Sequence, residues 1–169
     1  MTKDIKQQDP MTDSTADQSL PKAQSLPGAV LFACTHNMIR SPMAEGLMKA
    51  MFPGRVFADS CGLNAGAPDG FVFYVMNEIG IDLTNHQPKS FDDLEDEYFD
   101  LIICFSDVSF AMAEEIARNK STEVEYWPVF DAALGSDNRE ERLKAYREVR
   151  DIISAKLKDR FGGDEAPVT

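Results

Sequence analysis

Four short, largely apolar runs alternate along the chain with longer segments in which apolar residues recur at helical spacing. Two of these runs, Ala29–Cys34 and Asp100–Phe105, are almost continuously apolar, which is typical of strands buried on both faces. Arg55–Ser60 and Glu123–Trp127 fit two further strands. We therefore expect four strands, each followed by a helix.

The helical segments lie at Ser41–Phe52, Asp69–Ile79, Val108–Arg118 and Asp137–Phe161. Ser41-Pro42 predicts the start of the first helix, because serine is a favoured N-cap and proline is favoured at the first helical position. Asp137 and Glu140 are spaced as a capping box and predict the start of the last helix. Gly80 and Gly162 predict the ends of the second and last helices.

Strands that alternate with helices predict an α/β fold, with a four-stranded parallel sheet and helices on both faces. Ligands of such folds bind at the carboxyl ends of the strands. Cys34 closes the first strand and therefore lies at the favoured end of the sheet.

The two ends of the chain differ from this pattern. Residues 1–27 contain many Gln, Asp, Ser, Thr and Pro and almost no large apolar side chains, so this segment cannot offset its ordering entropy and is predicted to be disordered. Residues 28–163 are expected to form one domain, and 164–169 a short flexible C-terminus.

Charge and composition narrow the function classes. The formal net charge of −12 disfavours nucleic acid and anionic membranes as partners. No apolar run is long enough for a signal peptide or a membrane span, which favours a cytoplasmic protein. Cys34, Cys61 and Cys104 are far apart, so neither a metal site, a cofactor nor a disulfide framework is predicted, and the oligomeric state is not readable.

The candidate chemistry lies in the loop between the first strand and the first helix, CTHNMIRS. Such a loop points backbone N–H groups into one concavity, and together with the helix dipole they bind anions. This anion-binding loop begins with a cysteine and ends with Arg40-Ser41. The residues predicted to hold phosphate are Thr35, His36, Asn37, Met38, Ile39, Arg40 and Ser41.

The residue types in this loop suit cysteine-dependent phosphate chemistry. The N–H groups, the dipole and the Arg40 charge favour the thiolate form of Cys34, which can attack phosphorus. Arg40 presents a planar fork that matches two phosphate oxygens. Ser41 supports the thiolate through its hydroxyl, and Asn37 tolerates left-handed backbone and can pin the loop through its amide.

The segment VLFACTHNMIRSPMAE, Val30–Glu45, resembles the signature of low-molecular-weight protein tyrosine phosphatases and of the related thioredoxin-coupled arsenate reductases. The resemblance extends from Gly28 to Phe161. It implies a phosphotyrosine phosphatase I-like fold, hydrolysis without a metal, and a phosphocysteine intermediate on Cys34.

The same resemblance implies two further site residues. Asp131 matches the family's general acid, which protonates the leaving oxygen. Asp137 is the rival acid, although a capping role already explains it. His86 resembles a histidine that supports the loop from behind.

The chain departs from the family pattern at four places. His36 stands where glycine is usual, Ile39 replaces a second loop cysteine, and Ala132 replaces the proline after the acid. The tyrosine pair that often follows the acid is absent. Trp127 and Phe130 are candidates to line the pocket instead, with simple core packing as the alternative.

Three functions are therefore weighed. The favoured one is phosphomonoester hydrolysis, as a protein-tyrosine phosphatase acting on a phosphorylated protein or a small phosphomonoester. An arsenate reductase needs resolving thiols within reach; Ser106 stands where the redox relatives have one, and Cys104 lies two residues earlier. A non-catalytic phosphoprotein-binding module is the third alternative.

Overall fold

The computed structural model describes residues 26–95 and 98–162. All but the last two residues of the predicted tail 1–27, and the whole predicted C-terminus 164–169, lie outside the described residues. In the described part of the chain, no helix combines the length and the apolar character needed to cross a bilayer.

Four parallel strands form one sheet in the order β2-β1-β3-β4. They are β1 (Ala29–Cys34), β2 (Phe57–Gly62), β3 (Leu101–Cys104) and β4 (Glu123–Tyr126). The predicted four-stranded parallel α/β fold is confirmed. The strand order reverses between β1 and its two neighbours, so the carboxyl end of β1 is the expected ligand position.

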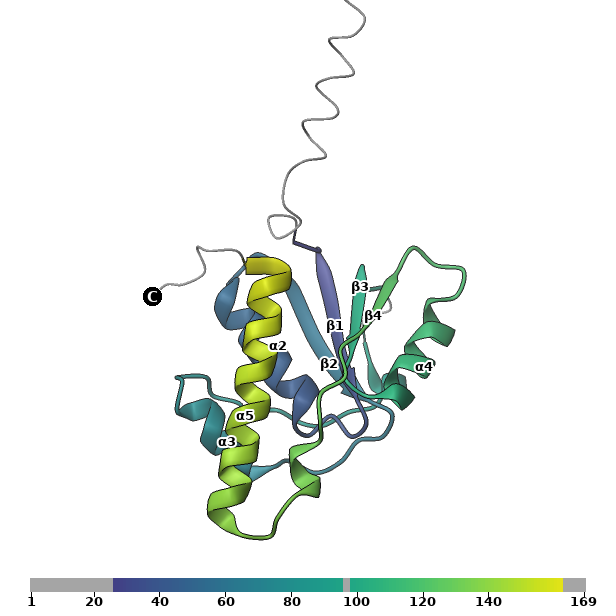
Figure 1. Cartoon of the computed structure of the whole chain (residues 1–169). Coiled ribbons are helices and arrows are strands. Elements are labelled where there is room, and N and C mark those ends of the chain that lie inside the picture. Colours follow the sequence, from purple (N-terminus) through teal and green to yellow (C-terminus); the bar gives the residue numbers. More distant parts are fainter. Residues whose placement is uncertain (1–25, 96–97, 163–169) are drawn as a thin grey trace, which may run out of the picture.

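Helices cover both faces of the sheet, with α2, α3 and α5 on one side and α4 on the other (Figure 1). They are α2 (Arg40–Met51), α3 (Gly70–Asn77), α4 (Asp107–Ala117) and α5 (Arg139–Leu157). Short turns of 3₁₀ helix are η2 (Phe91–Asp93) and η3 (Ala132–Leu134), and a π-helical turn, η4 (Lys158–Gly162), follows α5.

The alternation of side chains along β1 divides the core into two parts. Val30, Phe32 and Cys34 face the side that α2 and α5 cover. Leu31 and Ala33 face the α4 side, together with a smaller buried set from the neighbouring strands and α4. Because adjacent residues point to opposite faces of a strand, a one-residue step decides which core a side chain joins.

Two predicted helix starts are wrong. Ser41 is not an N-cap: α2 begins at Arg40, after Ile39, which makes no capping hydrogen bond with its side chain. The Ser41 hydroxyl turns instead toward Cys34. At α5 the cap is Asn138, whose Oδ1 accepts from the backbone N–H of Glu141, so the capping box predicted one residue earlier does not form.

The second strand also lies two residues later than predicted, at Phe57–Gly62 instead of Arg55–Ser60. Parallel pairing with β1 sets this register, with Phe57 opposite Ala29 and Gly62 opposite Cys34. Only the paired strand could reveal this shift, because the segment has too few large apolar residues to fix its own bounds.

Candidate functional site

The loop from Cys34 to Ser41 joins the end of β1 to the start of α2, as predicted. Cys34 is buried, and its Sγ lies 3.0 Å from Oγ of the fully buried Ser41. Asn37 adopts left-handed backbone with φ 55°, a conformation that asparagine tolerates. The turn thereby brings the first and last side chains of the loop together.

The side chain of Asn37 ties the loop to its surroundings. Its Nδ2 donates to Oγ of Ser41 at 2.8 Å and to Oγ of Ser60 at 3.0 Å. Its Oδ1 accepts from the backbone N–H of Lys89 at 2.9 Å. Nε2 of His86 lies 3.1 Å from the carbonyl oxygen of Asn37, so His86 stands behind the loop and outside the cavity.

The chain after β2 runs beside the loop and hydrogen-bonds to it. The N–H groups of Leu63, Asn64 and Gly66 donate to the carbonyl oxygens of Cys34, Thr35 and His36, in that order. A Cβ on Gly62 would lie 2.7 Å from the backbone nitrogen of Asn37, so only glycine fits there. Our sequence reasoning missed this support, although glycine at a strand end is a signal for a close backbone approach.

Arg40 is held in a fixed orientation at the start of α2. The residue is buried, and its Nη1 donates to the carbonyl oxygens of Phe105 at 3.2 Å and Val129 at 2.9 Å. Its Nη2 lies 3.9 Å from Oδ2 of Asp131. The guanidinium is therefore not on the helix surface; it is aimed between β1 and the loop that carries Asp131.

Asp131 precedes η3 and faces Arg40 across the cavity. Its Oδ1 accepts from the backbone N–H of Ala133 at 3.0 Å, and its side chain is 23% exposed. A carboxyl group in this position is oriented by the turn and remains accessible to a substrate. Asp137, the rival acid, is exposed and does not line the cavity.

A cavity of about 240 Å³ opens at the carboxyl end of β1. It is lined by Cys34, His36, Met38, Ile39, Arg40, Asp131, Ala133 and Leu134. Thr35, Asn37 and Ser41 do not line it; Asn37 and Ser41 are buried behind the loop, and the Thr35 carbonyl is hydrogen-bonded to Asn64. The structure thus brings the predicted nucleophile, arginine and acid to one cavity.

Trp127 and Phe130 are not among the residues that line the cavity. Trp127 packs edge-on against Phe105, with ring centroids 6.1 Å apart, and donates from Nε1 to Glu125. Phe130 is exposed. Ala133 and Leu134 line the cavity where Trp127 and Phe130 were candidates to do so. Both belong to the η3 turn that follows Asp131.

Comparison with known proteins assigns the fold and site to a family. The family model for low-molecular-weight phosphotyrosine protein phosphatase matches residues 29–161. The chain belongs to this family.

Similar members of the low-molecular-weight phosphatase family carry different names. The chain is 30% identical over 131 residues to an arsenate reductase of Shouchella clausii, covering 76% of this chain and 91% of that protein. It is 23% identical over 130 residues to a glutaredoxin arsenate reductase of Synechocystis, covering 77% and 93%. The crystal structure of the Erwinia amylovora tyrosine phosphatase amsI superimposes with a TM-score of 0.65 at 22% identity, covering 80% and 91%. Family membership therefore identifies an enzyme without choosing between the two reactions.

The other two thiols of this low-molecular-weight phosphatase family member lie on the α4 side of the sheet, away from Cys34. Cys61 and Cys104 both pair in register with Ala33, whose side chain points to that face. Burial raises the pKa of both thiols, that of Cys104 to about 12. All three cysteines are free.

The positions at which a resolving cysteine or a metal site would be sought show neither in the described part of the chain. Ser106, at the position of the redox relatives' cysteine, accepts from the N–H of Ser109 and caps α4. Within 26–95 and 98–162, no three His, Cys, Asp or Glu side chains gather as a metal ion would need.

Proposed function

We propose that this protein hydrolyses phosphomonoesters through a phosphocysteine intermediate on Cys34, as a protein-tyrosine phosphatase. The observation that carries the proposal is the shared cavity: Cys34, Arg40 and Asp131 line it together. A nucleophile, an anion-binding cation and a carboxyl group are the parts that such a reaction needs.

In the first step the Cys34 sulfur attacks phosphorus, the S–P bond forms, and the ester P–O bond breaks. Asp131 gives its proton to the departing oxygen. Arg40 binds two equatorial phosphate oxygens with its fork and stabilises the charge that develops on them. The backbone carbonyls of Phe105 and Val129 hold the guanidinium in place before substrate arrives.

In the second step Asp131, now a carboxylate, takes a proton from water, and the water oxygen attacks phosphorus. The S–P bond breaks, phosphate leaves, and the thiolate returns. The Ser41 hydroxyl, 3.0 Å from Sγ, stabilises the thiolate by donating to it. Asn37 supports this orientation, because its amide donates to the same hydroxyl oxygen.

Arsenate reduction is the second candidate, favoured by the names of the relatives of Shouchella clausii and Synechocystis. Reduction of arsenate to arsenite takes two electrons, which two thiols supply as they form a disulfide. Cys61 and Cys104 face the opposite side of the sheet and are held as neutral thiols. The route left for this chain is an external thiol, such as glutathione with glutaredoxin.

The test is turnover of p-nitrophenyl phosphate by the wild-type protein and by Cys34→Ser. We expect turnover by the wild type and a loss of at least about a thousandfold in the variant. Equal rates would contradict the proposal. Tight phosphopeptide binding without turnover would support the non-catalytic module, and arsenate reduction with glutathione and glutaredoxin would support the second candidate.

A further inference from the structure

Two arginines at the start of α5 differ from those farther along the same helix. Arg147 and Arg150 form ion pairs with Glu78. Within the described residues, no ion pair joins Arg139 or Arg142 to a carboxylate. These two cations are therefore available to an anionic partner.

Aromatic rings hold both guanidinium groups. The Arg142 guanidinium lies 4.7 Å from the ring centre of Phe71, and that of Arg139 lies 5.7 Å from the ring centre of Tyr74. Nη2 of Arg142 donates to the Tyr146 hydroxyl, which donates in turn to Asp69 at 2.8 Å. Nε of Arg142 is buried, so its remaining Nη1 group and the exposed Arg139 are the donors open to a carboxylate. Because the rings already restrict both side chains, little further entropy is lost on binding.

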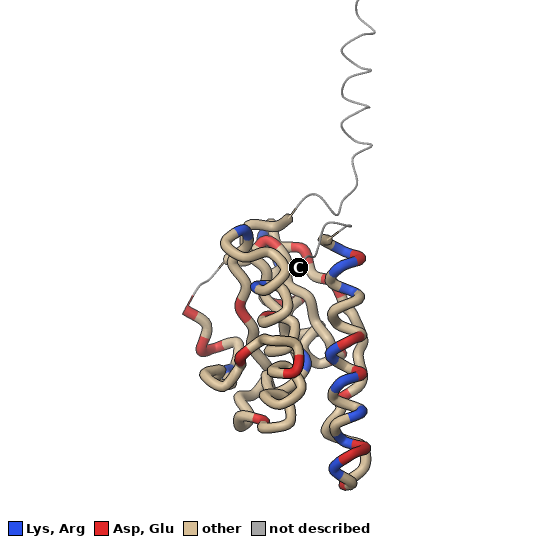
Figure 2. The backbone as a smooth tube through the Cα atoms, turned by 90° about the vertical axis from the view of Figure 1, so that its left-hand side faces the viewer, with Lys and Arg blue, Asp and Glu red and all other residues tan. Residues whose placement is uncertain are grey.

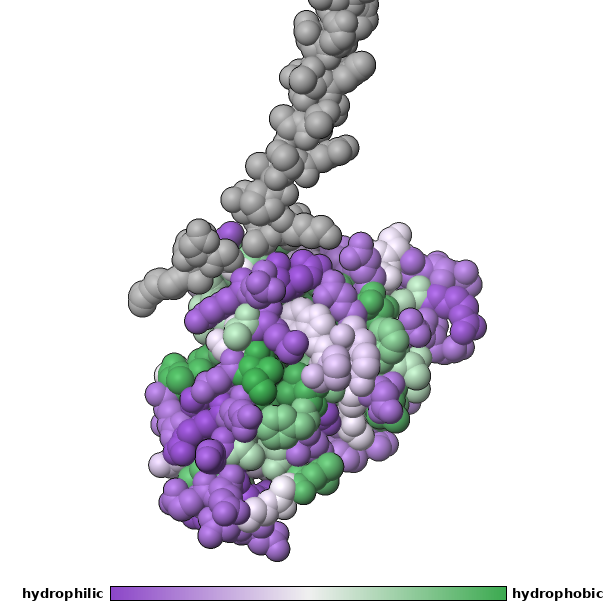
Figure 3. Space-filling view, in the orientation of Figure 1, coloured by the Kyte–Doolittle hydropathy of each residue, from purple (hydrophilic) through white to green (hydrophobic). Residues whose placement is uncertain are grey.

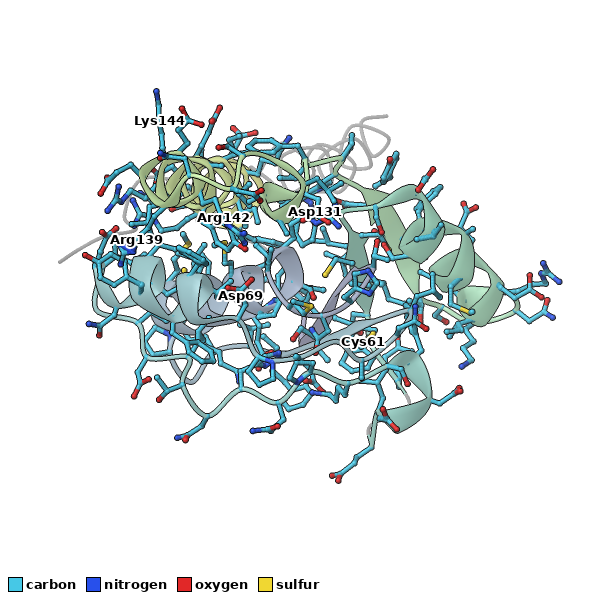
Figure 4. The ribbon with its side chains drawn as sticks, turned by 90° about the horizontal axis from the view of Figure 1, so that it is seen from below. Cys61, Asp69, Asp131, Arg139, Arg142 and Lys144 are labelled. Atoms are coloured by element: carbon cyan, nitrogen blue, oxygen red, sulfur yellow. The ribbon has the colours of Figure 1, made fainter. Side chains whose placement is uncertain are left out.

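Two independent connections link this arginine pair to the catalytic cavity. Leu134 lines the cavity, and Arg139 follows five residues later, at most about 18 Å away along the chain. On the other side, a Cβ added to Gly66 would clash with the Met38 side chain of the cavity wall. Asp69, three residues later, is joined to Arg142 through Tyr146. Figure 4 shows Arg142 between Asp131 and Arg139 at this end of the molecule.

An exposed apolar side chain, Leu134, stands at the edge of the cavity from which the chain leads to Arg139. Leu134 is 81% exposed, the most exposed of the large hydrophobic side chains described. Figure 3 shows a small hydrophobic area near the lower edge of the molecule, bordered by hydrophilic surface. A peptide that leaves the cavity over Leu134 would reach Arg139 within about five residues.

We propose that Arg139 and Arg142 bind acidic residues that flank the phosphorylated residue of a protein substrate. The inference rests on the proposed phosphatase function and narrows its substrate class. Charge complementarity carries it: a chain of net charge −12 repels acidic segments in general, so the unpaired arginines beside the cavity create a local exception.

The acidic residues near Arg139 and Arg142 do not form ion pairs that would neutralise the positive charge of these two side chains. Figure 2 shows basic and acidic residues alternating along α5. Arg139, Arg142 and Tyr146 share one helical face, whereas Glu140 and Glu141 project from the others. Asp137 and Asp69 are close enough to act on Arg142 electrostatically, and neither forms an ion pair with it.

The experiment measures the affinity of two phosphotyrosyl peptides, one with aspartates flanking the phosphotyrosine and one with asparagines in their place. The protein carries Cys34→Ser, so binding is measured whether or not the enzyme turns over. We expect the acidic peptide to bind about fivefold more tightly in 0.1 M salt, with the preference declining as salt is raised. Adding Arg139→Glu should abolish the preference.

Lys144→Glu is the matched control, because it makes the same charge change on another face of α5. It should keep the preference within about twofold. Equal affinities for the two peptides, a preference that survives Arg139→Glu in a folded protein, or an equal loss in Lys144→Glu would overturn the inference. Turnover of p-nitrophenyl phosphate by the wild type tests the proposed phosphatase function separately.

Discussion

Three neighbouring strands carry all three thiols, and the two faces of the sheet give those thiols different surroundings. Cys34 ends β1 on the α2 side, beside the Ser41 hydroxyl and at the wall of a cavity. Cys104 ends β3 and Cys61 is the last residue but one of β2, and both lie on the α4 side among apolar residues such as Leu31 and Phe99. The position of a cysteine along its strand decides which face of the sheet its thiol points to, and that face decides the surroundings of the thiol.

The same comparison separates the two reactions open to the family. A phosphatase needs one activated thiol with a cation and an acid, which the Cys34 side provides. A reductase that uses its own thiols needs a second one in reach of the first. The sheet itself separates Cys34 from the others, and this favours hydrolysis.

The largest effect is expected at the acid on the Cys34 side. Asp131→Asn should lower kcat for an alkyl or aryl phosphate by about 10²–10⁴-fold, because the leaving oxygen loses its proton donor. Asp107→Asn, at the first turn of α4 on the other side of the sheet, is the matched control and should leave kcat unchanged. Steady-state rates measure both. An unchanged rate for Asp131→Asn would remove this residue from the mechanism.

Alkylation compares the thiols directly. At pH 7.5, iodoacetamide should modify Cys34 at least about a hundredfold faster than Cys61 or Cys104, because burial raises the pKa of both of the latter. Phosphate should slow the modification of Cys34 alone. Peptide mass spectrometry measures each site, and comparable rates for Cys104 and Cys34 would contradict the contrast between the two faces.

The third prediction concerns Gly62, which follows Cys61 in β2 and packs against the backbone of Asn37 in the Cys34–Ser41 loop. Gly62→Ala should lower kcat by about 10–100-fold, because its Cβ displaces the loop that orients Cys34. Gly70→Ala is the control, since no atom lies within 4 Å of the added Cβ there. If Gly62→Ala kept full activity, the close approach would not position the loop.

The smallest effect concerns stability at high pH. The thiol of Cys104 has its pKa raised to about 12 from 9.0, so above pH 9 the unfolded chain releases a proton that the folded chain keeps. The stabilisation is complete below pH 9 and declines as pH rises, by about 1.4 kcal/mol per pH unit. Urea unfolding at pH 8, 9 and 10 should show a shallower fall in Cys104→Ala than in the wild type. Parallel falls would show that this thiol does not contribute.

Sequence periodicity predicted the four-stranded parallel sheet, because buried strands and amphipathic helices leave strong local patterns. The sequence also predicted the loop from Cys34 to Ser41, because the strand before it and the helix after it are local features. At Asn37 the residue type only allowed left-handed backbone, which the structure shows. The shift of β2 to Phe57–Gly62 depends on pairing with β1, which no local pattern contains.

The parts of the site that the sequence did not predict also depend on contacts between residues far apart along the chain. Ser60 and Gly62 support the loop from another strand, and Leu134 takes the position considered for Trp127 and Phe130. Asp131 was suggested by family resemblance, and the structure places it 3.9 Å from Arg40. Contacts between residues about ninety positions apart are decided by the packing of the whole domain.

The central claim is tested most directly by removing the two thiols on the α4 side together. The account predicts that Cys61→Ala/Cys104→Ala, once shown to be folded, hydrolyses p-nitrophenyl phosphate within about twofold of the wild-type kcat/KM, because neither thiol touches the cavity. The contradicting result is a wild-type protein that reduces arsenate with its own thiols, paired with a double variant that has lost this activity.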